Sequence, residues 1–185
     1  MFNDNKRVRL GDYIQQVRGV SYKPADLSLA LDDEHVTLLR ANNIGGGIVN
    51  FDEVQYVSRK KVSETQIIRK KDILLCASSG SIEHVGKTAI CSFDGEYTFG
   101  AFCKLIRVTG DISAEYISAY LQGDEYRKII SDLAQGTNIN NLRNEHIDEL
   151  LIPLPGEDEE KAFVEILKQS DKSKYKCHIV RRLLC

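Results

Sequence analysis

Residues 71–80 read Lys71-Asp-Ile-Leu-Leu-Cys-Ala-Ser-Ser-Gly80 and place an apolar run directly before a polar loop. An apolar run of this length, bounded by turn residues, is typical of a buried strand. Short segments of similar character recur along the chain, and Gly45-Gly-Gly47 marks a turn because consecutive glycines disfavour regular structure. Strands are predicted over residues 35–44, 48–51, 54–57, 72–77, 87–93 and 102–108. They predict a curved mixed sheet or a small barrel.

Helical periodicity replaces this pattern after Gly110. Apolar residues spaced three and four apart indicate amphipathic helices, and Ser113 is placed to cap the first of them. Helices are predicted over residues 112–121, 124–133 and 143–150, with a last strand over 150–154. Near the N-terminus, the spacing between Val8 and Val17 favours a short helix that stops at Gly19. The expected fold class is α/β (α+β), with helices flanking the sheet.

One long helix is predicted from Glu157 onward, because an acidic first turn suits the positive end of a helix dipole. Side chains at alternating spacings of three and four form the heptad seam of a coiled-coil-type helix. The seam residues are Phe163, Ile166, Ser170, Ser173, Cys177 and Val180. We expect residues 156–185 to form a helical spacer and dimerisation arm that follows a globular domain of residues 1–155. The alternative is a helix that folds back on its own domain.

Charge is unevenly distributed along the 185 residues, although the net charge is only −2. Residues 59–107 carry a net charge of +4 and residues 111–160 a net charge of −9. A segregated chain can present a basic face to one partner, and chance clustering on a solvated surface is the alternative. The five scattered cysteines favour neither a disulfide scaffold nor a zinc site. With no signal-like or membrane-spanning run, we expect a cytoplasmic protein without membrane contact.

The segment Gly80-Ser-Ile-Glu-His-Val-Gly-Lys-Thr88 looks at first like a nucleotide-binding loop. That loop has four residues between its glycines and opens a helix. Here five residues separate the glycines, and a predicted strand follows. A nucleophile elbow and a Rossmann-type glycine turn are also missing from the sequence. We therefore expect no catalytic residue, no metal and no cofactor, and a small hydrolase based on Ser79 or Ser81 lacks a base–acid pair.

Three polar loops mounted on predicted strands carry side chains suited to DNA. Arginine can bind guanine, asparagine can bind adenine, and serine or threonine can contact bases or phosphates. The candidate DNA contacts are Arg40, Asn43, Ser79, Ser81, His84, Lys87, Thr137 and Asn138. Two basic runs flank the middle loop in sequence and could neutralise backbone phosphates. The candidate phosphate contacts are Lys60, Lys61, Lys70 and Lys71.

These motifs resemble, in order, those of target recognition domains in type I restriction–modification specificity subunits. Val36-Thr-Leu-Leu-Arg-Ala-Asn-Asn-Ile44 is similar to the family's Leu-Arg-x-x-Asn-Ile strand. Lys71–Gly80, followed by Val85-Gly-Lys87, resembles its Gly-Asp-Ile-Leu segment and the Gly-Lys/Arg motif after it. Ala134-Gln-Gly-Thr-Asn-Ile139 and Leu151-Ile-Pro-Leu-Pro155 resemble its closing block. The resemblance extends along nearly the whole chain.

The resemblance implies a non-catalytic, sequence-specific reader of double-stranded DNA. Family members direct methylation and restriction subunits to a bipartite site, and each of their two recognition domains reads one half. This chain departs from the pattern because it holds one domain and one helix, and because Gly156-Glu-Asp-Glu-Glu160 stands where a Glu-Glu-Gln segment is usual. A half-subunit, a fragment and an inactive cassette all fit these departures. The alternative function is a protein-interaction module that uses the C-terminal helix and has lost DNA binding.

Overall fold

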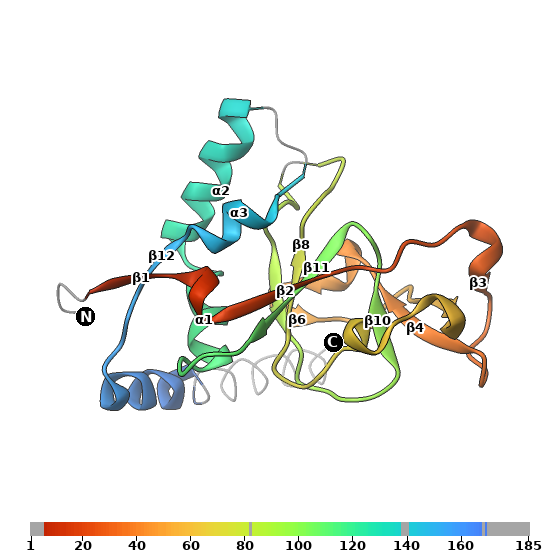
Figure 1. Ribbon diagram of the computed structural model, residues 1–185, viewed down its shortest axis with the longest axis horizontal. Helices are drawn as coiled ribbons and strands as arrows, with labels where there is room; N and C mark the ends of the chain where they lie inside the picture. The colour runs from red at the N-terminus through yellow and green to blue at the C-terminus, as the bar shows by residue number, and fades with distance from the viewer. Residues whose placement is uncertain (1–5, 82, 138–140, 168, 170–185) are drawn as a thin grey trace, which may run out of the picture. The chain divides into compact units, whose positions relative to one another are not determined.

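The computed structural model describes residues 6–81, 83–137, 141–167 and 169 (Figure 1). The chain divides into two compact units. The larger unit is Val8–Ile152, and the smaller one comprises residues 1–7 and 153–185.

A six-stranded sheet forms the centre of the larger unit. Its order is β2 (Ile14–Arg18), β11 (Cys103–Val108), β8 (Ile73–Cys76), β9 (Thr88–Ile90), β6 (Gly47–Val49) and β5 (Ile44–Gly45). Neighbouring strands are antiparallel except for the parallel pair of β6 and β9. All four residues of β8 are buried, which explains its uninterrupted apolar sequence. The strands predicted over residues 72–77, 87–93 and 102–108 thus correspond to β8, β9 and β11.

A second sheet of four strands lies to the right of the first in Figure 1. Its order is β10 (Tyr97–Phe99), β4 (His35–Leu39), β7 (Gln55–Ser58) and β3 (Leu27–Ser28). Two further strands, β1 (Arg7–Arg9) and β12 (Leu151–Pro153), pair with each other. Each sheet has an open strand order. The mixed α+β class is therefore confirmed, and the described residues form open sheets and not a closed barrel.

Three α-helices cover the six-stranded sheet on the side away from β3 and β4 (Figure 1). They are α1 (Ala114–Tyr120), α2 (Asp124–Thr137) and α3 (Asn144–Asp148). The predicted cap of α1 is confirmed, because the Ser113 hydroxyl accepts a hydrogen bond from the Tyr116 backbone N–H at 3.3 Å. Thr88 donates its hydroxyl to the Leu121 carbonyl at 3.2 Å and so ties β9 to the end of α1.

Two local predictions are wrong. The segment between Val8 and Val17 forms β1, a 3-10 turn over Leu10–Asp12, and β2, where a helix was expected. Five residues of β2 pair with β11, and this long-range ladder outweighs the local apolar spacing. The glycine run is not a turn throughout, because Gly45 lies in β5 and Gly47 in β6.

Three of the five cysteines, Cys76, Cys91 and Cys103, are free and buried in the core. Burial raises the pKa of the Cys76 thiol to about 11 and that of Cys91 to about 12, and it also raises the pKa of Cys103. These thiols are therefore protonated at neutral pH and unreactive.

Within the smaller unit, residues 157–167 are helical, and Lys161 pairs with Glu157 one turn earlier at 2.6 Å. Phe163 is half-buried and Ile166 is 64% exposed. The other seam residues, Ser170, Ser173, Cys177 and Val180, lie outside the described residues. Among the helices of the described ranges, none combines the length and apolar character needed to cross a membrane.

Candidate nucleic-acid interface

Three polar segments that are distant in sequence meet where β8 ends. β11 and β9 run antiparallel to β8, so the residues that precede them lie beside the residues that follow β8. Strand β4 reaches the same place, because the Gly100 N–H donates to the carbonyl of Leu39 at 2.9 Å. We call this region the loop end, made of residues 40–43, 78–81, 83–87, 100–102 and 141–144.

The turn at residues 100–102 holds the loop end together. The carbonyl of Phe102 accepts hydrogen bonds from the backbone N–H groups of Ala77 at 2.9 Å and Ser78 at 3.0 Å. The Cys103 N–H closes the turn on the Gly100 carbonyl at 2.8 Å. On the other side, a Cβ at Gly19 would lie 2.1 Å from the Gly100 oxygen, so only glycine fits there. The turn is therefore fixed from several directions.

Helix α2 fixes the far side of the 78–87 loop. Tyr126 donates its hydroxyl to the Gly86 carbonyl at 2.9 Å, and the Arg127 guanidinium donates to the Val85 carbonyl at 3.2 Å. Gly86 has φ +78°, and a Cβ there would lie 2.8 Å from a methyl carbon of Ile130. Burial raises the pKa of the Tyr126 hydroxyl, which is therefore uncharged at neutral pH. This packing explains the glycine of the Val85-Gly-Lys87 motif.

The predicted contacts of the middle loop differ in exposure. Ser81 and His84 are exposed, whereas Ser79 and Lys87 are partly buried. The Ser79 hydroxyl accepts a hydrogen bond from the Ser81 backbone N–H at 3.2 Å. This bond within the loop fixes the position of the Ser79 side chain. A bridge between Ser78 and Asn141 brings the third polar segment to this loop. Thr137 ends α2, and Asn138 lies outside the described residues.

A pocket of about 600 Å³ opens between the first two loops. Its walls include Tyr22, Arg40, Asn42, Ser79 and Phe102. Arg40 donates one terminal nitrogen to the Glu53 carbonyl at 2.8 Å, while its buried Nε has no hydrogen-bond partner among the described residues. The predicted contact Arg40 thus lies at the wall of this pocket.

The two neighbouring asparagines of the first loop face opposite ways. Asn43 is fully buried, accepts the Arg40 backbone N–H at 2.9 Å and donates to the Asp52 carbonyl at 2.8 Å. The side-chain amide of Asn43 is therefore buried and hydrogen-bonded within the loop, and it is not available for a DNA contact. Asn42 is exposed and lines the pocket. The sequence pattern pointed to this loop, and burial identifies Asn42, and not Asn43, as its exposed asparagine.

A second pocket of about 420 Å³ shares Ala101 with the first and is basic. Arg18, Lys104 and Arg143 line it together with one acidic residue, Glu145. Lys104 donates to the Asn144 side-chain oxygen at 2.7 Å, and burial lowers its pKa against the opposing effects of Asp148 and Glu145. Sequence reasoning missed these cations, because Arg18 and Lys104 become neighbours only through the register of β2 and β11.

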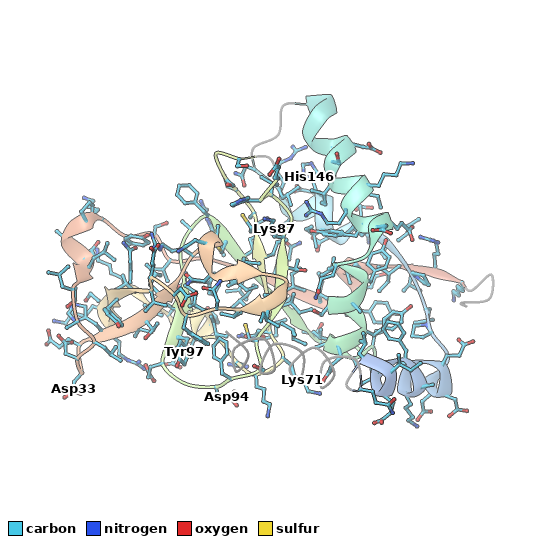
Figure 2. All side chains as sticks on the ribbon, turned by 180° about the vertical axis from the view of Figure 1, so that it is seen from behind. Asp33, Lys71, Lys87, Asp94, Tyr97 and His146 are labelled. Atoms are coloured by element: carbon cyan, nitrogen blue, oxygen red, sulfur yellow. The ribbon has the colours of Figure 1, made fainter. Side chains whose placement is uncertain are left out.

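The predicted basic runs lie elsewhere. β7 runs antiparallel to β4 with Ser58 opposite His35, so residues 59–61 are one strand length, about 16 Å, from Arg40. In the same way Lys71 precedes β8 while the loop end follows it, and Figure 2 shows Lys71 toward the bottom of the view, away from Lys87. Lys61 pairs with Asp26 at 3.3 Å and Lys71 with Glu115 at 3.0 Å.

Lys60 and Lys70 are exposed, and Arg59 forms an ion pair with Glu96. Within the described residues, Arg18, Lys87, Lys104 and Arg143 have no carboxylate within ion-pair distance, and the same holds for Lys60 and Lys70. The described part of the chain also shows no cluster of acidic, histidine and cysteine side chains that could hold a metal ion. The loop end thus gathers hydrogen-bond donors and basic side chains around two pockets.

Comparisons with known proteins agree on one family. The model of the type I restriction modification DNA specificity domain matches residues 7–178. The chain is 36% identical over 172 residues to the type I restriction enzyme StySPI specificity subunit of Salmonella potsdam and 35% identical to the EcoKI specificity subunit of Escherichia coli K12. Each alignment covers 91% of this chain and 37% of the relative, so the chain spans little more than a third of these subunits.

Solved structures show the same fold at lower identity. The HsdS subunit from Thermoanaerobacter tengcongensis matches with a TM-score of 0.64 at 15% identity, over 91% of this chain and 37% of that one. The type I restriction–modification S subunit from M. genitalium matches with a TM-score of 0.61 at 16% identity, over 92% of this chain and 41% of that one. None of these comparisons favours the alternative of an interaction module that has lost DNA binding.

Proposed function

The chain belongs to the type I restriction modification DNA specificity family, and from that membership we propose that its loop end reads one half of a bipartite DNA target. The membership confirms the prediction of a recognition component without catalysis of its own. In the proposal, the chain directs methylation and restriction subunits to that target. Residues 1–155 serve as the recognition domain.

The observation that carries this proposal is the convergence of base-reading donors and unpaired cations at the loop end. Arg40, Asn42 and Ser79 line one pocket, and their guanidinium, amide and hydroxyl groups match the donor and acceptor patterns of base edges. The cations lie beside them, where a duplex seated on the loops would present phosphates. Both kinds of contact are needed, since phosphates give affinity and base edges give specificity.

We assign the phosphate contacts to Arg18, Lys87, Lys104 and Arg143. These side chains lie in the loop end or directly beside it, and none of them has a carboxylate within ion-pair distance among the described residues. Lys60, Lys61, Lys70 and Lys71 remain candidates for a more distant part of the duplex, because they lie about one strand length away. Ser81, His84, Thr137 and Asn138 are kept as further DNA contacts around the middle and third loops.

Arg40 provides the direct test of base reading. The cognate site is first read from the methylated adenines of cells that carry the complete restriction–modification system. Arg40→Ala should then weaken binding to that site by about 1–3 kcal/mol and leave random-sequence binding nearly unchanged. Arg59→Ala is the matched control, because Arg59 is an exposed arginine paired with Glu96. Equal losses on both DNAs, or no loss in a folded Arg40 variant, would remove Arg40 from base recognition.

For residues 156–185 we propose self-association through the predicted seam. The exposed Ile166 belongs to the seam, whereas the exposed Ala162 does not. Ile166→Glu should shift sedimentation toward the monomer, and Ala162→Glu should leave the distribution as in the wild type. If the wild type is itself monomeric at high concentration, the seam serves another subunit or this chain's own domain.

A further inference from the structure

Phe102 is a large apolar side chain that the fold does not need at its position. It is 70% exposed, and the preceding Ala101 is exposed as well, although the next residue, Cys103, is buried in the core. A phenyl ring exposed to water loses the favourable free energy of burial that normally places phenylalanine in a protein core. Isolated exposed apolar residues are common, so its meaning depends on where and how rigidly the ring is held.

The ring projects from the most tightly held turn of the loop end. Its own carbonyl accepts two backbone N–H groups, and the turn is closed by the bond from Cys103 to Gly100. Val20 adds a third anchor, because its N–H donates to the Phe99 carbonyl at 2.8 Å. The backbone under the ring is therefore preorganised, and binding would restrict only its side-chain torsions.

The surroundings of Phe102 identify the kind of group it meets. Arg40, Asn42 and Ser79 share its pocket, and across Ala101 lies the basic pocket with Arg18. The ring thus stands between donors suited to base edges and cations suited to phosphates. In the major groove of DNA, the 5-methyl group of thymine is the one apolar feature of the base edges.

We propose that Phe102 contacts the 5-methyl group of a thymine and makes this half-site selective for thymine at one position. The inference rests on the proposed DNA recognition and deepens it by naming the chemical group that is read. Phe51, Phe93 and Tyr97 differ in this respect: their rings pack on one another with centroids 4.7–5.5 Å apart. Phe102 has no ring partner among the described residues.

Deoxyuridine substitution isolates the methyl group, because it removes that group and keeps every hydrogen bond of the base. Each thymine of the cognate half-site is replaced in turn, and the dissociation constant is measured for the full chain. The wild type should bind about three to five times more weakly at one position, the loss expected for one methyl-sized apolar contact. Phe102→Ala should bind the thymine and deoxyuridine forms of that site equally, and Phe102→Leu should retain part of the discrimination.

Phe51→Ala is the matched control, since it also removes an exposed aromatic ring and should leave the deoxyuridine profile as in the wild type. A profile that Phe102→Ala leaves unchanged overturns the inference while DNA recognition stands. Enhanced 2-aminopurine fluorescence on binding, lost in Phe102→Ala without any deoxyuridine effect, would also overturn it and indicate a ring inserted between base steps. A wild type that does not discriminate between cognate and random DNA would overturn the proposed function itself.

Discussion

The two ends of strand β8 use charge in opposite ways. Before the strand lies what we call the paired end, residues 69–72 with Arg107, where the Arg107 guanidinium makes two hydrogen bonds to the Asp72 carboxylate, at 2.9 and 2.7 Å. Asp72 is 3% exposed, and the ion pair raises the pKa of Arg107. After the strand, at the loop end, basic side chains line a pocket without carboxylate partners.

This difference teaches that position in the fold, and not density of charge in the sequence, separates structural cations from binding cations. In the conspicuous basic runs, Arg59, Lys61 and Lys71 each pair with an acid, whereas Lys60 and Lys70 are exposed. The cations of the loop end are isolated in sequence and are brought together by strand pairing. Mutations at the paired end should therefore change stability, and mutations at the loop end should change binding.

The largest effect is expected for Asp72→Ala at the paired end. The substitution leaves the largely buried Arg107 without its carboxylate and removes the acceptor for the Arg69 N–H. Loss of one partner from a buried ion pair destabilises a fold by about 3–5 kcal/mol. Chemical denaturation should show that loss in the free energy of unfolding, while the DNA affinity of the folded fraction stays as in the wild type.

Arg59→Ala is the comparison for that measurement, because Arg59 and Glu96 form an exposed ion pair. Its loss should change the unfolding free energy by about 0–1 kcal/mol. If Asp72→Ala lowered the free energy of unfolding as little as Arg59→Ala, the ion pair at the paired end would not stabilise the fold as we infer.

The second effect concerns the rigidity of the loop end. Gly86→Ala forces a side chain into a left-handed conformation and toward Ile130, and should destabilise the fold by about 1–3 kcal/mol. It should also weaken cognate binding, because the middle loop loses its attachment to α2. Gly80→Ala is the control in the same loop, since a Cβ there meets nothing within 4 Å. Melting curves and cognate affinities are measured for both variants, and equal behaviour would contradict this role for Gly86.

Much of the sheet was predictable from the sequence, because β8, β9 and β11 are short apolar runs between turn residues. Helix α1 was predictable as well, since its cap is encoded locally by Ser113. β2 was not, because its strand state depends on pairing with a partner that lies about 90 residues further along the chain. Strand β10 was missed for a similar reason: its three residues pair only with distant β4.

The candidate site was predictable at the level of loops and not of side chains. The polar composition marked the loops of Arg40 and Ser79. Composition does not tell which of two adjacent asparagines the fold buries, and only the structure separates Asn42 from Asn43. The role of Phe102 was also hidden, since an apolar residue at the start of a predicted strand is expected to be buried.

A third, smaller effect is expected in the salt dependence of DNA binding. It should differ between the cations at the loop end and those of the two basic runs. Arg18→Ala and Arg143→Ala should each lower affinity for cognate and random DNA alike. Each should reduce the slope of log affinity against log salt by about 0.9, the value for one phosphate contact. Lys60→Ala and Lys70→Ala, taken from the runs away from the loop end, should change the slope less. The reverse ranking would move the phosphate contacts to the basic runs and refute our assignment.

The smallest effect is a pH dependence centred on His146, which is labelled above Lys87 in Figure 2. Burial and the positive charges of Arg143 and Lys104 lower the pKa of His146, and Glu145 opposes them. The folded chain therefore holds this proton less readily than the unfolded chain. Its contribution to the free energy of unfolding is present at pH 7.5 and declines as the pH falls through the ordinary histidine range near about 6.5.

His146 is only partly buried, so the decline should be modest. The unfolding free energies of the wild type and of His146→Gln, measured at pH 7.5 and 5.5, isolate it. DNA affinity should depend on pH in the opposite direction from the free energy of unfolding. A phosphate seated against Arg143 and Lys104 adds negative charge beside the imidazole and raises its pKa, so binding takes up a proton. DNA affinity should then increase slightly as the pH falls toward 6, in the wild type and not in His146→Gln. If the His146 signal in NMR titrations keeps the same pKa with and without bound DNA, no phosphate lies in the basic pocket, and the loop end reads DNA without it.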